Sequence, residues 1–290
     1  MKYPCKIDLH IHTTVSDGTD RPEEIINCVR KMDIALFSIS DHDAIKGCGI
    51  VQHCLQEGDP QFITGVEFSC KDEEGQYHIL GYHYDPDAAA IREVVDTGHA
   101  LRMNKLRRRL DFLEHEFGFT FSEEDREVLF ALDNPGKPHL GNLMVRYGYA
   151  PSKEIAINQF INQLHSSSEY IRPEEAIRAI LASDGIPVLA HPSYGRGDDI
   201  IVGDDMDRRL KKLIGFGLQG VEAFYSGFSP RLQNEMLALA DQYGLYVTAG
   251  SDYHGRNKLV HLGETNLDTV REYPEGLCRF LHEVQAEEQE

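Results

Sequence analysis

Positive charge is scarce in this 290-residue sequence: 29 Lys and Arg residues stand against 48 Asp and Glu residues, a formal net charge of −19. Proteins hold duplex nucleic acid and anionic membranes through surplus basic charge, so this balance argues against both as partners. Uninterrupted apolar stretches long enough to span a bilayer are also missing. The net charge does not exclude anionic small molecules as substrates, because bound divalent metals can reverse the local sign of the charge.

Cysteine pairs with the C-x-x-C spacing of zinc or redox sites are missing among the six cysteines. A chain of this length does not need disulfides to hold its core together. We therefore expect incidental thiols in a reducing compartment, and a cytoplasmic protein.

The most informative stretch that is present is Asp8-Leu9-His10-Ile11-His12. Its polar and apolar residues alternate with the period of a β-strand, which puts Asp8, His10 and His12 on one face. Two neighbouring imidazoles on a strand can chelate a divalent metal. A surface strand with two solvated histidines explains the same five residues equally well, so this stretch alone does not decide.

Short apolar strands alternate with helical patterns along most of the chain, which predicts an α/β fold with a mainly parallel sheet. A helix is expected from Pro22 to about Lys31, with Asp20 as its N-cap. Further helices are expected over Pro173–Ser183, Asp204–Gly215, Ser229–Gly244 and about Leu267–Val284. Strands after the first are expected over Ala35–Ser40, Phe62–Val66, Tyr77–Tyr82, Ile186–Ala190, Gly220–Phe224 and Leu245–Ala249.

Residues 87–168 break this alternation, because they contain charged helical segments and no clear strand. We predict one barrel domain formed by residues 1–86 and 169–290, with 87–168 inserted as a helical cap. The basic cluster Lys105–Arg109 in this insertion is typical of a solvated helix face, and contact with a phosphate is the less favoured interpretation.

Metal-type side chains collect at or near the ends of the predicted strands, where parallel barrels assemble their active sites. Each has a simple structural alternative; Asp41, for example, could cap a helix. Chance is nevertheless a poor explanation for six histidines and three carboxylates at one end of one barrel. The residues are His10, His12, Asp17, His42, Glu67, His78, His191, Asp252 and His254.

The order and surroundings of these residues resemble the polymerase and histidinol phosphatase (PHP) family over the whole chain. The motifs are Asp8-Leu9-His10-Ile11-His12, Ser40-Asp41-His42, Gly65-Val66-Glu67, His78, Ala190-His191-Pro192 and Gly250-Ser251-Asp252-Tyr253-His254-Gly255. Further segments resemble the small stand-alone phosphoesterases of that family: Lys137-Pro138-His139, Gly220–Tyr225 and Leu245–Ala249. The resemblance implies a distorted (β/α)7 TIM-like barrel, here with the helical cap subdomain inserted.

The resemblance also implies two or three divalent ions of manganese, iron or zinc, whose ligands match this sequence residue by residue. One set is His10, His12, Glu67 and Asp252; another is Glu67, His78 and His191, with Glu67 bridging; the last is Asp17, His42 and His254. Asp8 and Asp41 are expected to orient the ligating imidazoles rather than to bind metal.

The implied reaction is hydrolysis of a phosphate ester by a metal-activated water, and the substrate we expect is a small nucleotide such as a nucleoside 3′,5′-bisphosphate. The expected catalytic residues are His191, Asp252 and His254, and the expected substrate contacts are Lys137, His139, Arg196 and Tyr225. A 5′-3′ exonuclease on short 5′-phosphorylated oligonucleotides and a histidinol-phosphate phosphatase are alternatives. A non-catalytic metal-binding regulatory domain is the least favoured, because all nine ligands are present.

Overall fold

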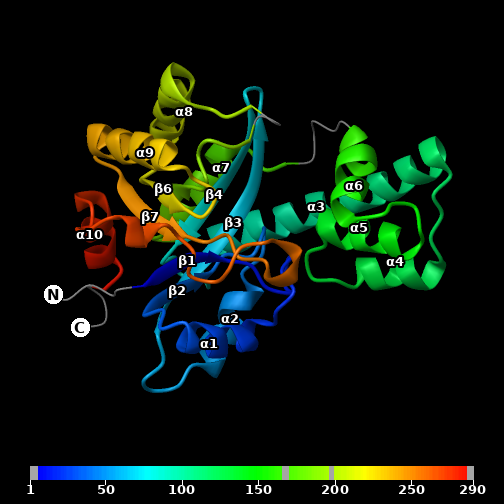
Figure 1. Cartoon of the computed structure of the whole chain (residues 1–290), viewed down its shortest axis with the longest axis horizontal. Helices are drawn as coiled ribbons and strands as arrows, with labels where there is room; N and C mark the ends of the chain where they lie inside the picture. Colours follow the sequence, from blue (N-terminus) through cyan, green and yellow to red (C-terminus); the bar gives the residue numbers. More distant parts are fainter. Residues whose placement is uncertain (1–5, 165–169, 196–198, 286–290) are drawn as a thin grey trace.

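Seven strands form one nearly closed barrel in the computed structural model, which describes residues 6–164, 170–195 and 199–285 (Figure 1). The strands neighbour one another in sequence order, and the end of the last one meets the first: the backbone N–H of His12 donates to the carbonyl of Tyr253 at 2.8 Å. The strands are β1 (Ile7–Ile11), β2 (Leu36–Ile39), β3 (Gln61–Asp72), β4 (Gly75–Tyr82), β5 (Ile186–Leu189), β6 (Gly220–Tyr225) and β7 (Tyr246–Gly250). The predicted α/β barrel is confirmed.

Strand β4 runs antiparallel to both of its neighbours, whereas the other neighbouring pairs are parallel. The predicted loop Lys71–Gln76 is mostly strand, because β3 continues to Asp72 and a tight turn leads into β4 at Gly75. Gly75 has a φ of 142°, a conformation that favours glycine. Glu67 and His78 therefore lie inside the two strands of a hairpin, and the expectation that each sits at the C-terminal end of a parallel strand is wrong.

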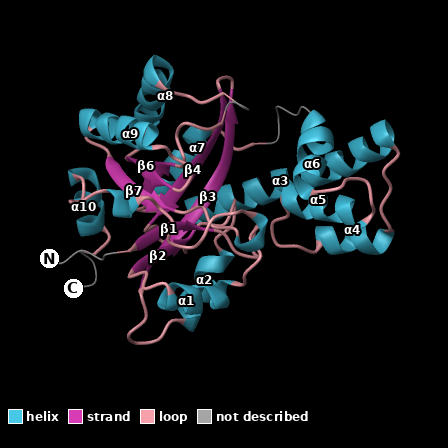
Figure 2. Ribbon diagram, viewed as in Figure 1, coloured by secondary structure: helices cyan, strands magenta, loops and turns pink. Residues whose placement is uncertain are grey.

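Helices cover the outside of the barrel (Figure 2). Pro22 begins α1, and Ile25, Ile26 and Val29 form its buried face, as the sequence pattern predicts. Asp20 is not its cap, because its carboxylate accepts a hydrogen bond from the Tyr253 hydroxyl instead. Helix α1 spans Pro22–Lys31. The other barrel helices are α2 (Lys46–Cys54), α7 (Pro173–Leu181), α8 (Gly203–Phe216), α9 (Pro230–Tyr243) and α10 (Glu275–Glu283).

The long C-terminal helix predicted from Leu267 is wrong. A short 3₁₀ turn, Leu267–Thr269, ends at Val270, and α10 starts only after Pro274. Proline fixes its own φ and restricts the residue before it, so one continuous helix cannot pass through this position.

The inserted segment contains helices and loops but no strand over the residues that the structure describes, and it packs around its own apolar cluster (Figures 1 and 2). Its long first helix, α3, ends at Gly118, whose φ of 68° suits a helix C-terminus. The helices are α3 (Ala89–Phe117), α4 (Glu123–Phe130), α5 (Lys137–Arg146) and α6 (Lys153–Ile155), followed by a π turn over Ala156–Phe160. The buried apolar residues of this cluster include Leu106, Leu110, Leu113, Leu140 and Met144. No helix within the described ranges is both long and apolar enough to cross a membrane.

Candidate metal centre

Glu67 lies at the centre of a group of five buried or half-buried histidines inside the barrel. Its two oxygens face different histidines, so a single carboxylate touches both halves of the group. Oε2 lies 3.3 Å from Nε2 of His10, 3.1 Å from Nε2 of His12 and 3.1 Å from Nδ1 of His42, and Oε1 lies 2.8 Å from Nδ1 of His78 and 3.1 Å from Nε2 of His191. This division is the geometry that a carboxylate bridging two metals requires.

Asp252 and Asp17 close the group on its other side. Oδ1 of Asp252 lies 3.3 Å from Nδ1 of His254 and 3.5 Å from Nε2 of His12. Oδ1 of Asp17 lies 3.2 Å from Nε2 of His254. All nine residues predicted as metal ligands are thus brought together, although they come from opposite ends of the chain.

Candidate ligand atoms group slightly differently from the predicted sets. Three groups have their atoms within 4.8 Å of one another: His10, His12 and Glu67; His42, Glu67 and His78; and His12, Asp17, His42 and His254. His42 therefore lies between two groups rather than in one, and His12 approaches Asp17 as well as Glu67.

Unsatisfied buried atoms point to a cation among these groups. Nε2 of His10, Nε2 of His12, Oδ1 of Asp17 and Oε2 of Glu67 are buried without a hydrogen-bond partner. Such atoms are costly unless something compensates them, and divalent ions bound by imidazole and carboxylate would satisfy all of them. The donor set therefore fits the divalent metals that the resemblance implies.

Electrostatics favour the metal-binding protonation states of Glu67 and His12, whereas the carboxylates around His10, with Glu222 foremost, outweigh its burial and raise the pKa of that imidazole. Burial alone would raise the pKa of Glu67, but the surrounding histidines, with His78 and His42 foremost, hold that pKa well below its usual range. Burial lowers the pKa of His12 to about 4, so its imidazole is neutral at neutral pH. A charged carboxylate and a neutral imidazole are the ligand forms required.

Glu222 on β6 is the main supporting residue to which the sequence analysis gave no role, although it lies in the motif Gly220–Tyr225. Its Oε1 atom lies 2.9 Å from Nδ1 of His10, and its Oε2 atom accepts a hydrogen bond from the backbone N–H of His191 at 2.8 Å. One buried carboxylate thereby fixes two predicted ligands, and it faces the ring nitrogen of His10 that is turned away from Glu67. The available signal was a single acid within the otherwise apolar strand Gly220–Tyr225.

Asp8 and Asp41 do not contact the imidazoles directly: Asp8 accepts from the backbone N–H of His10 at 3.3 Å, and Asp41 accepts from the Ser16 hydroxyl, which faces Nδ1 of His12 at 3.4 Å. Oδ2 of Asp8 accepts hydrogen bonds from the hydroxyl of Ser251 and the backbone N–H of Gly263, at 2.6 and 2.7 Å. Asp41 accepts from the backbone and side chain of Thr13, both at 2.7 Å. Each carboxylate instead fixes a loop that carries a ligand, and burial raises the pKa of both to about 6.

A cavity of about 310 Å³ opens beside the metal ligands. Asp17, His42 and His78 line it on the barrel side, together with four cationic side chains of the inserted helices: Arg102, Lys105, Arg109 and Lys137. The expectation that the basic cluster on α3 is a solvated face holds for Arg107 and Arg108 but is wrong for Lys105, which is buried and lies 3.6 Å from the centre of the Tyr170 ring. The spacing of residues 102, 105 and 109, which places them on one helix face, was the signal for this.

The predicted substrate contacts lie in different places. Lys137 lines the cavity, and its Nζ atom donates to Oδ1 of Asn162 at 2.6 Å. His139 does not line this cavity; its Nδ1 accepts from the backbone N–H of Gly136 at 3.0 Å. Tyr225 is buried and donates its hydroxyl to Asp252. Arg196 lies outside the described residues.

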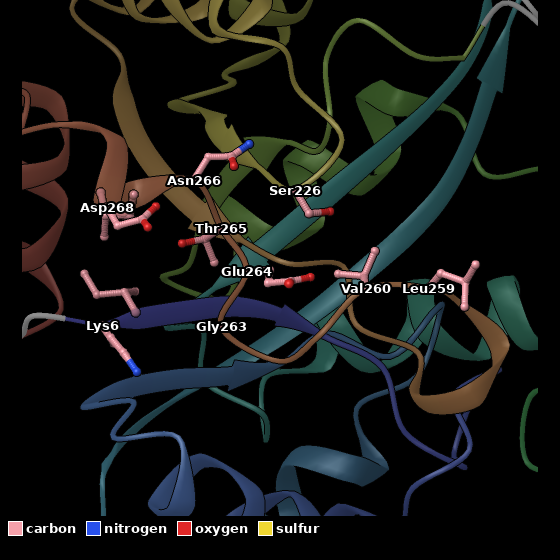
Figure 3. A pocket seen from close by; sticks show the side chains of 11 residues that line it. Lys6, Ser226, Leu259, Val260, Gly263, Glu264, Thr265, Asn266 and Asp268 are labelled. Atoms are coloured by element: carbon pink, nitrogen blue, oxygen red, sulfur yellow. The ribbon is translucent and has the colours of Figure 1, made fainter.

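A second cavity, of about 470 Å³, lies along the loop after β7 and contains none of the predicted site residues (Figure 3). Its polar side chains are used within the fold; Asn266, for example, donates to the backbone carbonyl of Tyr225 at 2.8 Å. The predicted site residues that line a cavity with the metal ligands, such as Asp17, His42 and Lys137, therefore belong to the first cavity and not to this one.

Comparisons with known proteins agree with this geometry. The chain is 28% identical to a 5′-3′ exoribonuclease of Haemophilus influenzae, with 91% of this chain and 95% of that protein covered. It is 26% identical to a 3′,5′-nucleoside bisphosphate phosphatase of Chromobacterium violaceum, with 86% and 87% covered. A crystal structure from Bifidobacterium adolescentis, of a candidate metal-dependent phosphoesterase, superposes with a TM-score of 0.78 at 29% identity and covers 96% of this chain and 98% of that one. The model of the PHP domain matches residues 8–283, and the chain therefore belongs to the PHP domain family, as its ordered motifs indicate.

Proposed function

We propose that this protein is a metal-dependent phosphatase that removes a phosphate from a small nucleotide carrying a second, separate phosphate, such as a nucleoside 3′,5′-bisphosphate. Metal-dependent phosphoesterase chemistry follows from the family and its named relatives. The observation that carries the narrower proposal is the 310 Å³ cavity, which has metal ligands on one side and four cationic side chains on the other. A cavity of this size suits one small ligand with two anionic ends.

The nine ligand residues would hold two or three divalent ions through the groups described above. When bound, such ions supply the Lewis acidity and positive charge that hydrolysis of a phosphate ester needs. Glu67 would hold the ions together, Glu222 and Tyr225 fix the ligands His10 and Asp252, and burial keeps the imidazole of His12 neutral. His254 is the candidate to donate a proton to the leaving oxygen.

Residues 87–168 act in this proposal as the cap that selects the substrate. Lys137 and the cationic face of α3 would hold the phosphate that is not cleaved, since ammonium and guanidinium groups bind phosphate oxygens strongly. We keep His139 and Arg196 as further candidates for substrate binding. The similar exoribonuclease of Haemophilus influenzae favours a second candidate function, removal of nucleotides from short 5′-phosphorylated RNA.

A phosphate-release screen of the manganese-loaded protein tests this proposal. The substrates are adenosine 3′,5′-bisphosphate, adenosine monophosphates, histidinol phosphate and 5′-phosphorylated dinucleotides. We expect the highest kcat/KM with the bisphosphate. A clear preference for dinucleotides would overturn the proposal in favour of the exonuclease, and a preference for histidinol phosphate would overturn the nucleotide assignment.

Two histidine variants serve as matched controls for this screen. His191→Ala should abolish release of phosphate from the preferred substrate, because His191 lies 3.1 Å from the bridging carboxylate. His53→Ala, on the exposed side of α2, should retain full activity. No phosphate release from any ester by the metal-loaded wild type would refute the enzymatic function altogether.

A further inference from the structure

Arg102 of the inserted helix α3 is joined to the barrel by a buried, forked ion pair. Its Nη2 and Nε atoms lie 2.6 and 3.1 Å from Oδ2 of Asp43, and Nη2 also donates to the hydroxyl of Ser69 at 2.8 Å. All three side chains are buried, with exposed fractions of 3–7%. A guanidinium that contacts a buried carboxylate through two of its nitrogens, and a hydroxyl as well, is held rigidly. Removal of the guanidinium would leave the buried carboxylate of Asp43 without its opposite charge.

This contact ends beside His42, the residue that lies between two ligand groups. Asp43 follows His42 directly, and its Oδ1 accepts the backbone N–H of Ser69 at 2.8 Å. Asp43 also has a φ of 49°, a strained conformation that persists only when its surroundings fix it. A second residue of the inserted segment, Asn134, donates its side-chain amide to the carbonyl of His42. Two residues of the inserted segment, Arg102 on α3 and Asn134 in the loop before α5, therefore hold the chain at Asp43 and His42.

The fit between α3 and this loop is close. A Cβ atom at Gly98 would lie 2.9 Å from Cβ of Asp43, so only glycine lets the helix pack against the loop at this point. Gly98 and Arg102 are one turn apart on α3, and together they hold Asp43 by shape and by charge.

His42 depends on these contacts more than His10 depends on its surroundings. The second ring nitrogen of His10 faces the buried carboxylate of Glu222 at 2.9 Å. The Nδ1 atom of His42 faces the hydroxyl of Ser69 at 3.5 Å, which is at the limit of a hydrogen bond. The same Nδ1 atom lies 3.1 Å from Oε2 of Glu67, so the His42 ring is held on its ligand side and through its backbone, without a separate buried carboxylate such as Glu222.

We propose that Arg102 is a positioning residue through which the inserted helices control the metal held by Asp17, His42 and His254. This inference rests on the proposed function, because it takes the cluster to bind divalent ions. Without the Arg102–Asp43 pair, the loop that carries His42 loses its buried anchor, whereas the ligands around His10 keep theirs. The metal at His42 is then lost or weakened selectively. Arg102 also lines the substrate cavity beside Lys105, so the same helix face binds substrate and completes the metal site.

Metal analysis of Arg102→Met, Arg102→Lys and Asp43→Asn tests this inference. Each protein is loaded with Mn²⁺ and dialysed, and bound metal is counted by mass spectrometry and titrated against a competing chelator. We expect Arg102→Met to lose one equivalent of Mn²⁺, or to bind it roughly 10- to 100-fold more weakly, as is usual when a supporting partner is removed. The tightest-bound equivalent should not change. Arg102→Lys should recover part of the affinity, because it restores the charge but not the fork.

Arg92→Met is the matched control. Arg92 lies on the same helix and pairs with Asp87 in solvent, so its removal should leave both metal content and affinity unchanged. Folding is checked by thermal unfolding, and if Arg102→Met does not fold, the two milder variants decide the question in the same assay. A folded variant with unchanged metal content and only a raised KM would overturn the inference, because Arg102 would then serve the substrate alone. Failure of wild-type protein to bind any divalent ion would instead refute the proposed function.

Discussion

The hydroxyl of Tyr225 donates to Oδ2 of Asp252 at 3.0 Å, while the other carboxylate oxygen, Oδ1, faces His10, His12 and His254. Nζ of Lys258 contacts the same Oδ2 atom. The two oxygens thus have separate tasks: one is fixed by the protein and the other points to the candidate metal sites. Asp252 also has a φ of 58°, so its backbone is held in a conformation that few non-glycine residues adopt.

Tyr225→Phe should weaken metal binding at the Asp252 position. The change removes a buried hydrogen bond to a charged group, which contributes about 1.5–3 kcal/mol, or roughly a 10- to 100-fold change in affinity. Lys258 still contacts Oδ2, so we expect a value near the lower end. Competitive Mn²⁺ titration measures the effect, with Tyr194→Phe as control, because that hydroxyl donates only to the carbonyl of Gly227. A raised KM with unchanged metal affinity would show that Tyr225 contacts substrate instead.

Glu222→Gln should lower metal affinity at the His10 position by about 10- to 100-fold. Glutamine keeps the shape and can still accept the His191 N–H, but it removes the charge that stabilises His10. Mn²⁺ titration and the metal count per chain measure this change. Glu264→Gln, whose carboxylate accepts only the backbone N–H of His261 in an exposed turn, should bind metal normally. Equal affinities for the two variants would contradict the role assigned to Glu222.

Substrate affinity should fall as the pH rises above about 8. Burial, with Arg109 nearby, lowers the pKa of Lys137 to about 8. Below that pH its ammonium is charged and attracts phosphate; above it the amine is neutral, so KM should rise. Lys137→Arg should flatten this rise, because guanidinium stays charged throughout. The check is KM for the bisphosphate between pH 6.5 and 9.5, and superimposable profiles for the two proteins would rule out a substrate contact by Lys137.

Removal of metal should destabilise the protein. An ion that binds only the folded state adds about 2.7 kcal/mol per site at a concentration 100-fold above its Kd. Thermal unfolding in excess chelator should therefore occur several degrees below unfolding in excess Mn²⁺, and added Mn²⁺ should restore the higher Tm. His191→Ala should show a smaller difference than His53→Ala. An identical Tm with and without chelator would contradict a metal centre at the ligands identified here.

Much of the metal centre could be predicted from local sequence. The alternation in Asp8–His12 places two imidazoles on one strand face, and the barrel confirms that the later motifs converge on them. Local pattern does not carry strand direction, however. The apolar residues of Tyr77–Tyr82 look alike in a parallel and an antiparallel strand, so the orientation of His78 became known only from the hairpin with β3.

Supporting residues were harder to predict because their partners are distant in sequence. Glu222 and His10 are 212 positions apart, and Arg102 and Asp43 are 59 apart. A buried acid in an apolar strand and a basic residue on a polar helix have ordinary local explanations, and only the folded contacts show what each one holds. Lys105 was assigned to solvent for the same reason, since a helix pattern does not reveal what covers its polar face.

The contact between the end of β7 and β1 has a consequence for the synthesis of this protein. The N–H of Tyr253 donates to the carbonyl of His10 at 3.2 Å, so the first and last ligands are joined only when the barrel closes. A nascent chain that still lacks residues 251–290 contains His10, His12 and Glu222, but not Asp252 or His254. The ligand group of His12, Asp17, His42 and His254 is therefore completed late, and a prematurely terminated product would lack that part of the centre.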